Sequence, residues 1–202
     1  AKQFKLIMNH IRRISEIVRN MLSFSRPVKE ETRSMADIRT LIDQATELLA
    51  YDKRSKGIRI DRSYSTVLEA ILVDSDRLIM VFTNIILNAF DALQNLEPGT
   101  AVITISAHME GDRTVLRFSD NGPGMSDYEI ENAFEPFFTT KQKKIGTGLG
   151  LYISYGIIGE HEGELSVESE PGQYTIFHID LPWDNQWEMD GDGEDEVSER
   201  GA

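Results

Sequence analysis

Apolar residues near the start of the chain are spaced alternately three and four positions apart, as on the seam of a coiled coil. The seam consists of Phe4, Ile7, Ile11, Ile14, Val18 and Met21. This spacing predicts a long helix over residues 1–24. Pro27 ends it, because proline disfavours helical backbone in the residue before it. The seam needs a partner, so a homodimer through residues 1–24 is one expectation.

Asp37 is the predicted cap of a second helix, whose apolar residues fall on one face up to about Tyr51. Beyond residue 57, stretches with an apolar period of two alternate with helical stretches. Strands are predicted near residues 58–60, 70–73, 102–105, 115–119, 165–168 and 175–181, and helices near 75–96, 127–133 and 149–160. This order predicts an α/β fold: a two-layer sandwich of a mixed, mostly antiparallel sheet with helices on one face, preceded by the long helix.

Composition divides the chain of 202 residues further. Residues 184–202 carry −7 of the net charge of −13, which predicts an acidic disordered tail from residue 183 onward, or less plausibly a docking arm. The predicted domains are a helical segment (1–26), a linker (27–36), a main domain (37–182) and this tail (183–202).

The same composition excludes several classes of protein. The acidic balance argues against nucleic acid as a partner. No apolar run approaches the ~20 residues of a membrane span, so a cytoplasmic protein without membrane contact is expected. The absence of cysteine excludes disulfides and thiolate chemistry.

Three polar residues of the helix predicted at 75–96 share one face, because Asn84, Asn88 and Asp91 are spaced by four and three. The helix is otherwise apolar, and buried amides need hydrogen-bond partners. Mg²⁺ prefers oxygen ligands and keeps water and phosphate in its shell, so an amide oxygen can complete that shell. A polar stripe that faces solvent is the alternative interpretation.

Asp120 begins the segment Asp-Asn-Gly-Pro-Gly-Met, directly after a predicted strand. An ordinary turn is the simpler interpretation, since Asn-Gly and Pro-Gly are common turn dipeptides. A carboxylate at the end of a strand in an apolar pocket, however, needs a donor. The exocyclic amine of adenine supplies one where guanine offers a carbonyl. Asp120 is therefore the candidate base-selecting residue, with Gly122 and Gly124 giving the backbone room to approach the ring.

A glycine-rich stretch, Gly-Thr-Gly-Leu-Gly-Leu at residues 146–151, opens the last predicted helix. Free N–H groups and the positive end of the helix dipole can hold phosphate, although a flexible hinge is the alternative. The stretch matches neither the Walker A pattern nor a strand running into G-x-G-x-x-G. The segment before it carries phenylalanines that could anchor a mobile lid and lysines that could screen triphosphate charge, or it is a solvated basic loop.

Taken together and in this order, these segments resemble the ATP-binding catalytic domain of sensor histidine kinases. That domain belongs to the superfamily of gyrase, heat-shock chaperone, histidine kinase and mismatch-repair ATPases. Residues 84–92 resemble its N box, 120–125 its G1 box, 134–141 its F box and 146–151 its G2 box.

The resemblance implies a Bergerat-type fold over residues 37–182, ATP as substrate and Mg²⁺ as cofactor. It implies that Asn88 ligates the metal, that Asp120 reads adenine and that residues 135–146 form the ATP lid. The residues that it assigns to ATP binding are Asn84, Asn88, Asp91, Asp120, Gly122, Gly124, Met125, Phe138, Lys141, Gly146, Thr147, Gly148, Leu149, Gly150, Leu151 and Thr175.

Asn84 helps to choose between the chemistries of the superfamily. Its ATP hydrolases carry a glutamate four residues before the metal-binding asparagine, to activate water. Asn84 holds that position here and cannot act as a general base. This difference favours phosphoryl transfer over hydrolysis.

The segment 1–26 resembles the second helix of the dimerisation and histidine-phosphotransfer domain of the family. The phospho-accepting histidine of the first helix should precede an acid, but His10 precedes Ile11. No catalytic residue is therefore assigned within this chain.

The resemblance implies a protein-histidine kinase whose acceptor histidine lies outside this chain. A histidine-bearing dimerisation domain and a response-regulator receiver domain are the implied partners, and the chain alone is not expected to autophosphorylate. A non-catalytic nucleotide-binding module and an ATP-hydrolysing clamp are the alternatives.

Overall fold

The computed structural model describes residues 32–97, 99–141 and 147–183. The helix predicted over residues 1–24 and the predicted acidic tail from residue 184 onward lie outside these ranges. The elements are β1 (Ser34–Ala36), α2 (Ile38–Leu48), the 3₁₀ turn η2 (Lys53–Ser55), β2 (Arg59–Tyr64), β3 (Ile71–Val73), α3 (Ser75–Leu93), β4 (Val102–Glu110), β5 (Arg113–Asp120), α4 (Asp127–Asn132), α5 (Gly150–Glu160), β6 (Glu164–Glu170) and β7 (Tyr174–Pro182). No helix within these ranges is long and apolar enough to cross a membrane.

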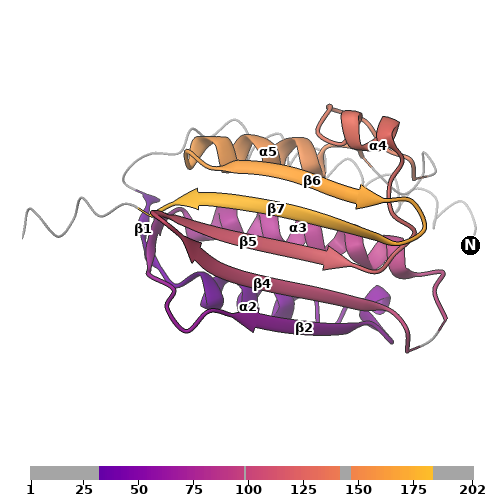
Figure 1. Cartoon of the computed structure of the whole chain (residues 1–202), viewed down its shortest axis with the longest axis horizontal. Coiled ribbons are helices and arrows are strands. Elements are labelled where there is room, and N and C mark those ends of the chain that lie inside the picture. The colour runs from indigo at the N-terminus through magenta and orange to yellow at the C-terminus, as the bar shows by residue number, and fades with distance from the viewer. Residues whose placement is uncertain (1–31, 98, 142–146, 184–202) are drawn as a thin grey trace, which may run out of the picture.

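Five strands form the main sheet in the order β2, β4, β5, β7, β6 (Figure 1). β4 and β5 form the predicted hairpin, and β6 and β7 form a second one whose strand β7 pairs antiparallel with β5. β2 differs from the other strands, because it runs parallel to β4. The sheet is therefore mixed and mostly antiparallel, which confirms the prediction.

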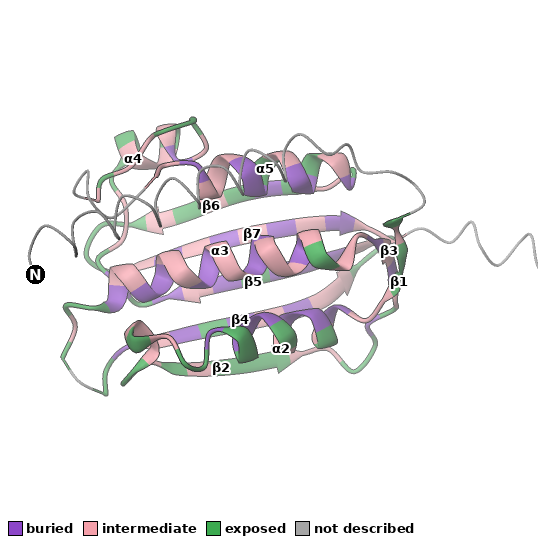
Figure 2. Cartoon of the chain, turned by 180° about the vertical axis from the view of Figure 1, so that it is seen from behind, coloured by how far each residue is buried: buried purple, intermediate pink, exposed green. Residues whose placement is uncertain are grey.

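The helices α2, α3 and α5 lie side by side on one face of the sheet, with α3 in the middle (Figure 2). α3 buries its sheet-facing side, where Phe82, Ile86 and Phe90 are fully buried. The ring of Phe82 lies 5.4 Å from that of Phe118 on β5, and this contact joins the two layers. The predicted two-layer α/β sandwich is therefore confirmed.

Short-range hydrogen bonds define where the helices begin. The Asp37 side chain accepts a hydrogen bond from the Arg39 N–H, which confirms the predicted cap of α2. The Asp74 side chain accepts one from the Arg77 N–H in the same way at the start of α3. Each cap satisfies a backbone donor that the first turn of a helix leaves without a partner.

One strand was not predicted. β1 lies within residues 27–36, which the sequence analysis treated as a linker, and it pairs antiparallel with β3. The predicted strand near residues 70–73 is therefore part of this two-stranded sheet at one end of the domain, not of the main sheet (Figure 1). A strand of three residues is too short to show a period of two, and only its partner identifies it.

Candidate nucleotide-binding site

Asp120 ends β5, and the register of the sheet places it opposite Thr175 of β7. Its side chain accepts a hydrogen bond of 2.9 Å from the Gly122 N–H. A side chain at Gly122 would put its Cβ 2.6 Å from the same carboxylate oxygen, so glycine is needed for this contact. Only 4% of Asp120 is exposed, and burial raises its pKa to about 6. A buried, poorly solvated acceptor thus stands at the strand end where the sequence predicted one.

The rest of this turn is fastened to the hairpin of β6 and β7. The Met125 N–H donates to the Ser169 hydroxyl at 2.8 Å, and that hydroxyl lies 3.2 Å from the Thr175 hydroxyl. Gly124 has φ +68, and a Cβ there would lie 2.1 Å from the backbone oxygen of Glu170. Close packing against the Glu170 backbone therefore requires glycine at position 124. Ser169 was not predicted, because a serine on an exposed strand gives no signal of its own.

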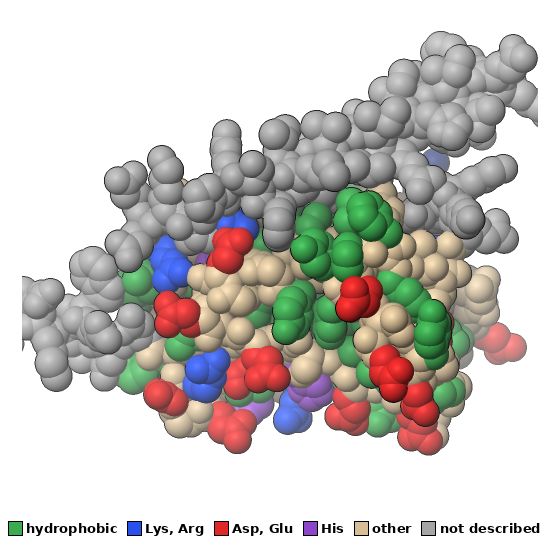
Figure 3. All heavy atoms as spheres, turned by 90° about the horizontal axis from the view of Figure 1, so that it is seen from above, with side chains coloured by type: hydrophobic (Ala, Val, Ile, Leu, Met, Phe, Trp, Pro, Cys, Tyr) green, Lys and Arg blue, Asp and Glu red, His purple; other side chains and the backbone are tan. Residues whose placement is uncertain are grey.

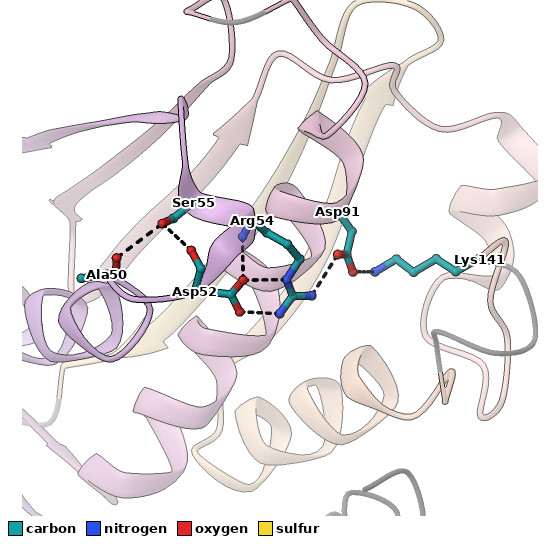
Figure 4. Close-up of polar contacts among 6 residues, drawn as sticks. All are labelled: Ala50, Asp52, Arg54, Ser55, Asp91 and Lys141. Carbon is teal, nitrogen blue, oxygen red and sulfur yellow. Dashed lines mark hydrogen bonds and ion pairs between the residues drawn. The ribbon is translucent and has the colours of Figure 1, made fainter. Parts of the chain in front are cut away.

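The polar face of α3 divides into two parts, of which Figure 4 shows the contacts of Asp91. Asn88 and Asp91 both accept hydrogen bonds from the ammonium group of Lys141, at 2.9 Å and 2.6 Å. The other oxygen of Asp91 accepts a hydrogen bond of 2.9 Å from Arg54. Arg54 comes from η2, 37 positions earlier in the chain, and no local sequence pattern predicts this contact.

Asn84 turns toward α5 instead. Its side-chain amide donates to the backbone oxygen of Gly150 and to the hydroxyl of Ser154, both at 3.4 Å. Asn84, Asn88 and Asp91 are all half-buried, and each has a partner. Asn84 therefore connects α3 to the first turn of α5, whereas Asn88 and Asp91 hold a cation.

The glycine-rich stretch leads into α5, which begins at Gly150 with Leu149 as its capping position. Within the described part of the chain, no side chain caps this helix end, so its first N–H groups are available to an anion. The Thr147 hydroxyl accepts a hydrogen bond from the Leu149 N–H at 3.3 Å. Leu151 is half-buried against the core. Gly146 lies outside the residues described.

Gly148 and Phe137 join the two ends of the loop between α4 and α5. The Phe137 N–H donates to the Gly148 oxygen at 2.8 Å, and both residues have positive φ. A Cβ at Gly148 would lie 2.4 Å from the carbonyl carbon of Phe137, so this approach requires glycine. Phe138 packs edge-on against Tyr128 of α4 at 5.9 Å. Of the segment predicted to be a lid, only residues 135–141 are described, and the contact of Phe138 with Tyr128 lies among them.

Asn88 and Asp91 suit a hard cation, because they already direct two oxygen atoms at one ammonium group. Among the described residues, no group of three or more His, Cys, Asp or Glu side chains could hold a metal ion by itself. A metal at Asn88 would therefore take its remaining ligands from water and phosphate, as Mg²⁺ commonly does.

Comparison with known proteins identifies the class. Residues 73–185, more than half of the chain, match the family of histidine kinase-, DNA gyrase B- and HSP90-like ATPases. The chain therefore belongs to this family, and within it to the ATP-binding catalytic domains of sensor histidine kinases.

Among its relatives, sporulation kinase E of Bacillus subtilis is 34% identical over 90% of this chain and 24% of its own length. Sensor histidine kinase ZraS of Escherichia coli is 31% identical over 84% of this chain and 35% of its own length. The structure of full-length ShkA in complex with AMPPNP superposes with a TM-score of 0.72 at 26% identity, over 86% of this chain and 36% of that one. The chain thus spans between 24% and 36% of the length of these three proteins.

Proposed function

We propose that this chain binds Mg·ATP and transfers its γ-phosphoryl group to a histidine of a dimerisation domain. From there the phosphoryl group passes to an aspartate of a response-regulator receiver domain. Sensor histidine kinases among the relatives support the reaction, and the AMPPNP bound to ShkA supports the ligand class. Positioning and charge neutralisation supply most of the catalysis in such a transfer.

The residues divide this work between two ends of the site. At one end the Asp120 carboxylate accepts a hydrogen bond from the adenine amine, beside Thr175. At the other end, the uncapped N–H groups of α5 and the Lys141 ammonium face the phosphates, and the Asn88 oxygen completes the metal shell. Mg²⁺ would supply charge neutralisation between the phosphate oxygens.

The contacts of Asn84 are the observation that favours phosphoryl transfer over ATP hydrolysis. Its amide nitrogen is engaged by Gly150 and Ser154, so this position holds α5 and offers no base to a water molecule. Asp91, the nearest acid on the helix, is held between two cations. Neither Asn84 nor Asp91 is thus free to activate water.

The test is a transfer assay with γ-labelled ATP and a separately expressed histidine-bearing dimerisation domain of the parent protein. We expect label on the histidine of the added domain and none on this chain alone. Asn88→Ala should abolish the transfer, whereas Asn132→Ala should not, since the Asn132 side chain donates to the Tyr128 oxygen within helix α4.

Three other results would contradict the proposal. Label on His10 of the chain alone would show autophosphorylation without a partner. Steady phosphate release abolished by Asn88→Ala would indicate a hydrolysing clamp. Tight nucleotide binding without any transfer to the added domain would indicate a non-catalytic module.

A further inference from the structure

Lys141 occupies the position where the Asn88 oxygen would meet a metal ion. Its ammonium nitrogen lies 2.9 Å from Asn88 Oδ1 and 2.6 Å from Asp91 Oδ2. An ammonium group has donors only, so it requires the oxygen and not the nitrogen of the Asn88 amide on this side. The same oxygen atom is the proposed metal ligand.

Asp91 is fixed in place by a second cation (Figure 4). Arg54 donates to its other oxygen at 2.9 Å, and Arg54 is held in turn by two hydrogen bonds to the Asp52 carboxylate. The Asp91 side chain is only 19% exposed. The carboxylate therefore cannot turn away from Lys141 without breaking its contact with Arg54.

A lysine and a divalent cation cannot share this position. Mg²⁺ needs its oxygen ligands at about 2.0–2.1 Å, and an ammonium group at hydrogen-bond distance from the same oxygen would lie against the ion and repel it. One cation must leave before the other binds.

We propose that Lys141 is a built-in counter-cation that exchanges with the metal, and that Asp91 and Arg54 are positioning residues that hold it there. The inference rests on the proposed binding of Mg·ATP. Without metal, the Lys141 ammonium supplies positive charge beside the phosphates. With metal bound, the Lys141 ammonium no longer contacts the Asn88 oxygen. Displacing Lys141 costs free energy, which lowers the gain in ADP affinity that the metal provides.

Isothermal titration calorimetry gives the dissociation constant of ADP in EDTA and in excess Mg²⁺. The measurable consequence is the ratio of the constant in EDTA to the constant in Mg²⁺. Lys141→Met should raise this ratio about tenfold, within the usual range for coupling between two ligands. A simple loss of phosphate contact affects both dissociation constants alike and cancels in the ratio. Lys56→Met removes the same charge from an exposed position and should leave the ratio unchanged.

Asp91→Asn separates a positioning residue from a metal ligand. As a positioning residue, Asp91 holds the competitor, so its neutralisation should raise the ratio about threefold by the same coupling. Added to Lys141→Met, it should cause no further rise, because both changes act through one contact.

Several outcomes would overturn the inference. An unchanged ratio in Lys141→Met would make Lys141 a phosphate contact independent of the metal. A lower ratio in Asp91→Asn would make Asp91 a metal ligand. If the wild-type chain binds ADP in neither buffer, the proposed function itself fails, and this is seen before any variant is compared.

Discussion

The site has two ends: a base end around Asp120, where adenine is proposed to bind, and a metal end around Asn88. The two ends are built by different means. At the base end, Asp120, Thr175 and Ser169 lie on adjacent strands, and the sheet register and backbone hydrogen bonds set their positions. At the metal end, Asn88 and Asp91 lie on α3 and Lys141 lies in the loop before α5, so a charged side chain joins the two segments.

This difference predicts that the base end contributes more to the stability of the fold, and that the metal end can rearrange more easily. The base end is part of the folded core, so changes there should alter the free energy of unfolding. The metal end rests on partly exposed ion pairs, which contribute little to stability and can exchange partners. A site built in this way keeps a rigid socket for the base while its phosphate contacts rearrange.

The largest expected effect is that of Gly124→Ala at the base end. Its Cβ would collide with the Glu170 backbone in a left-handed conformation, which should lower the free energy of unfolding by about 3–5 kcal/mol. Gly111→Ala is the matched control, with φ +62 and open space around its Cβ, and should cost about 1–2 kcal/mol. Urea denaturation measures both, and equal losses would show that the Glu170 contact is unimportant.

Asp120→Asn should make the fold more stable while weakening ADP binding. Burial raises the pKa of Asp120 from 3.8 to about 6, so its stabilising contribution is present below pH 3.8 and is lost as the pH rises through 6. The amide side chain of the variant does not ionise, so the variant does not lose stability in this pH range. Its advantage in free energy of unfolding should be near zero at pH 4 and reach about 2–3 kcal/mol at pH 8.

Urea denaturation at several pH values checks this prediction, with Asp112→Asn in the exposed β4–β5 turn as the control. A variant that is less stable than the wild type at pH 8 would mean that the ionised carboxylate is well solvated in the folded protein.

The smallest effect is expected at the metal end. Arg54→Met breaks the ion pairs with Asp52 and Asp91, whose side chains are partly exposed, and should cost about 1 kcal/mol at low salt. The cost should shrink in 1 M NaCl, where the Debye length falls to about 3 Å. Arg59→Met, in a more exposed pair, should cost less. A loss as large as that of Gly124→Ala would place the metal end in the folding core.

Patterns with a short period were predictable from the sequence. Neighbouring residues predict the helical face of α3, the β4–β5 hairpin and the acid at the end of β5, Asp120. The partners of that acid and of Asp91 do not, because Thr175 and Arg54 reach them through sheet register and tertiary packing. The spacing of Asn84 placed it correctly on α3, but only the position of α5 shows that it binds Gly150.

The contact between Phe137 and Gly148 has a consequence for how the loop can vary. This backbone hydrogen bond holds the two ends of the loop together. The length of the segment between them therefore has little effect on the entropic cost of closing the loop. Doubling the length of such a loop adds only about 0.6 kcal/mol to the cost of closure. Insertions and deletions within residues 142–145, between Lys141 and the glycine-rich stretch, should therefore leave the sandwich folded, and this stretch can diverge in length while the rest of the site stays the same.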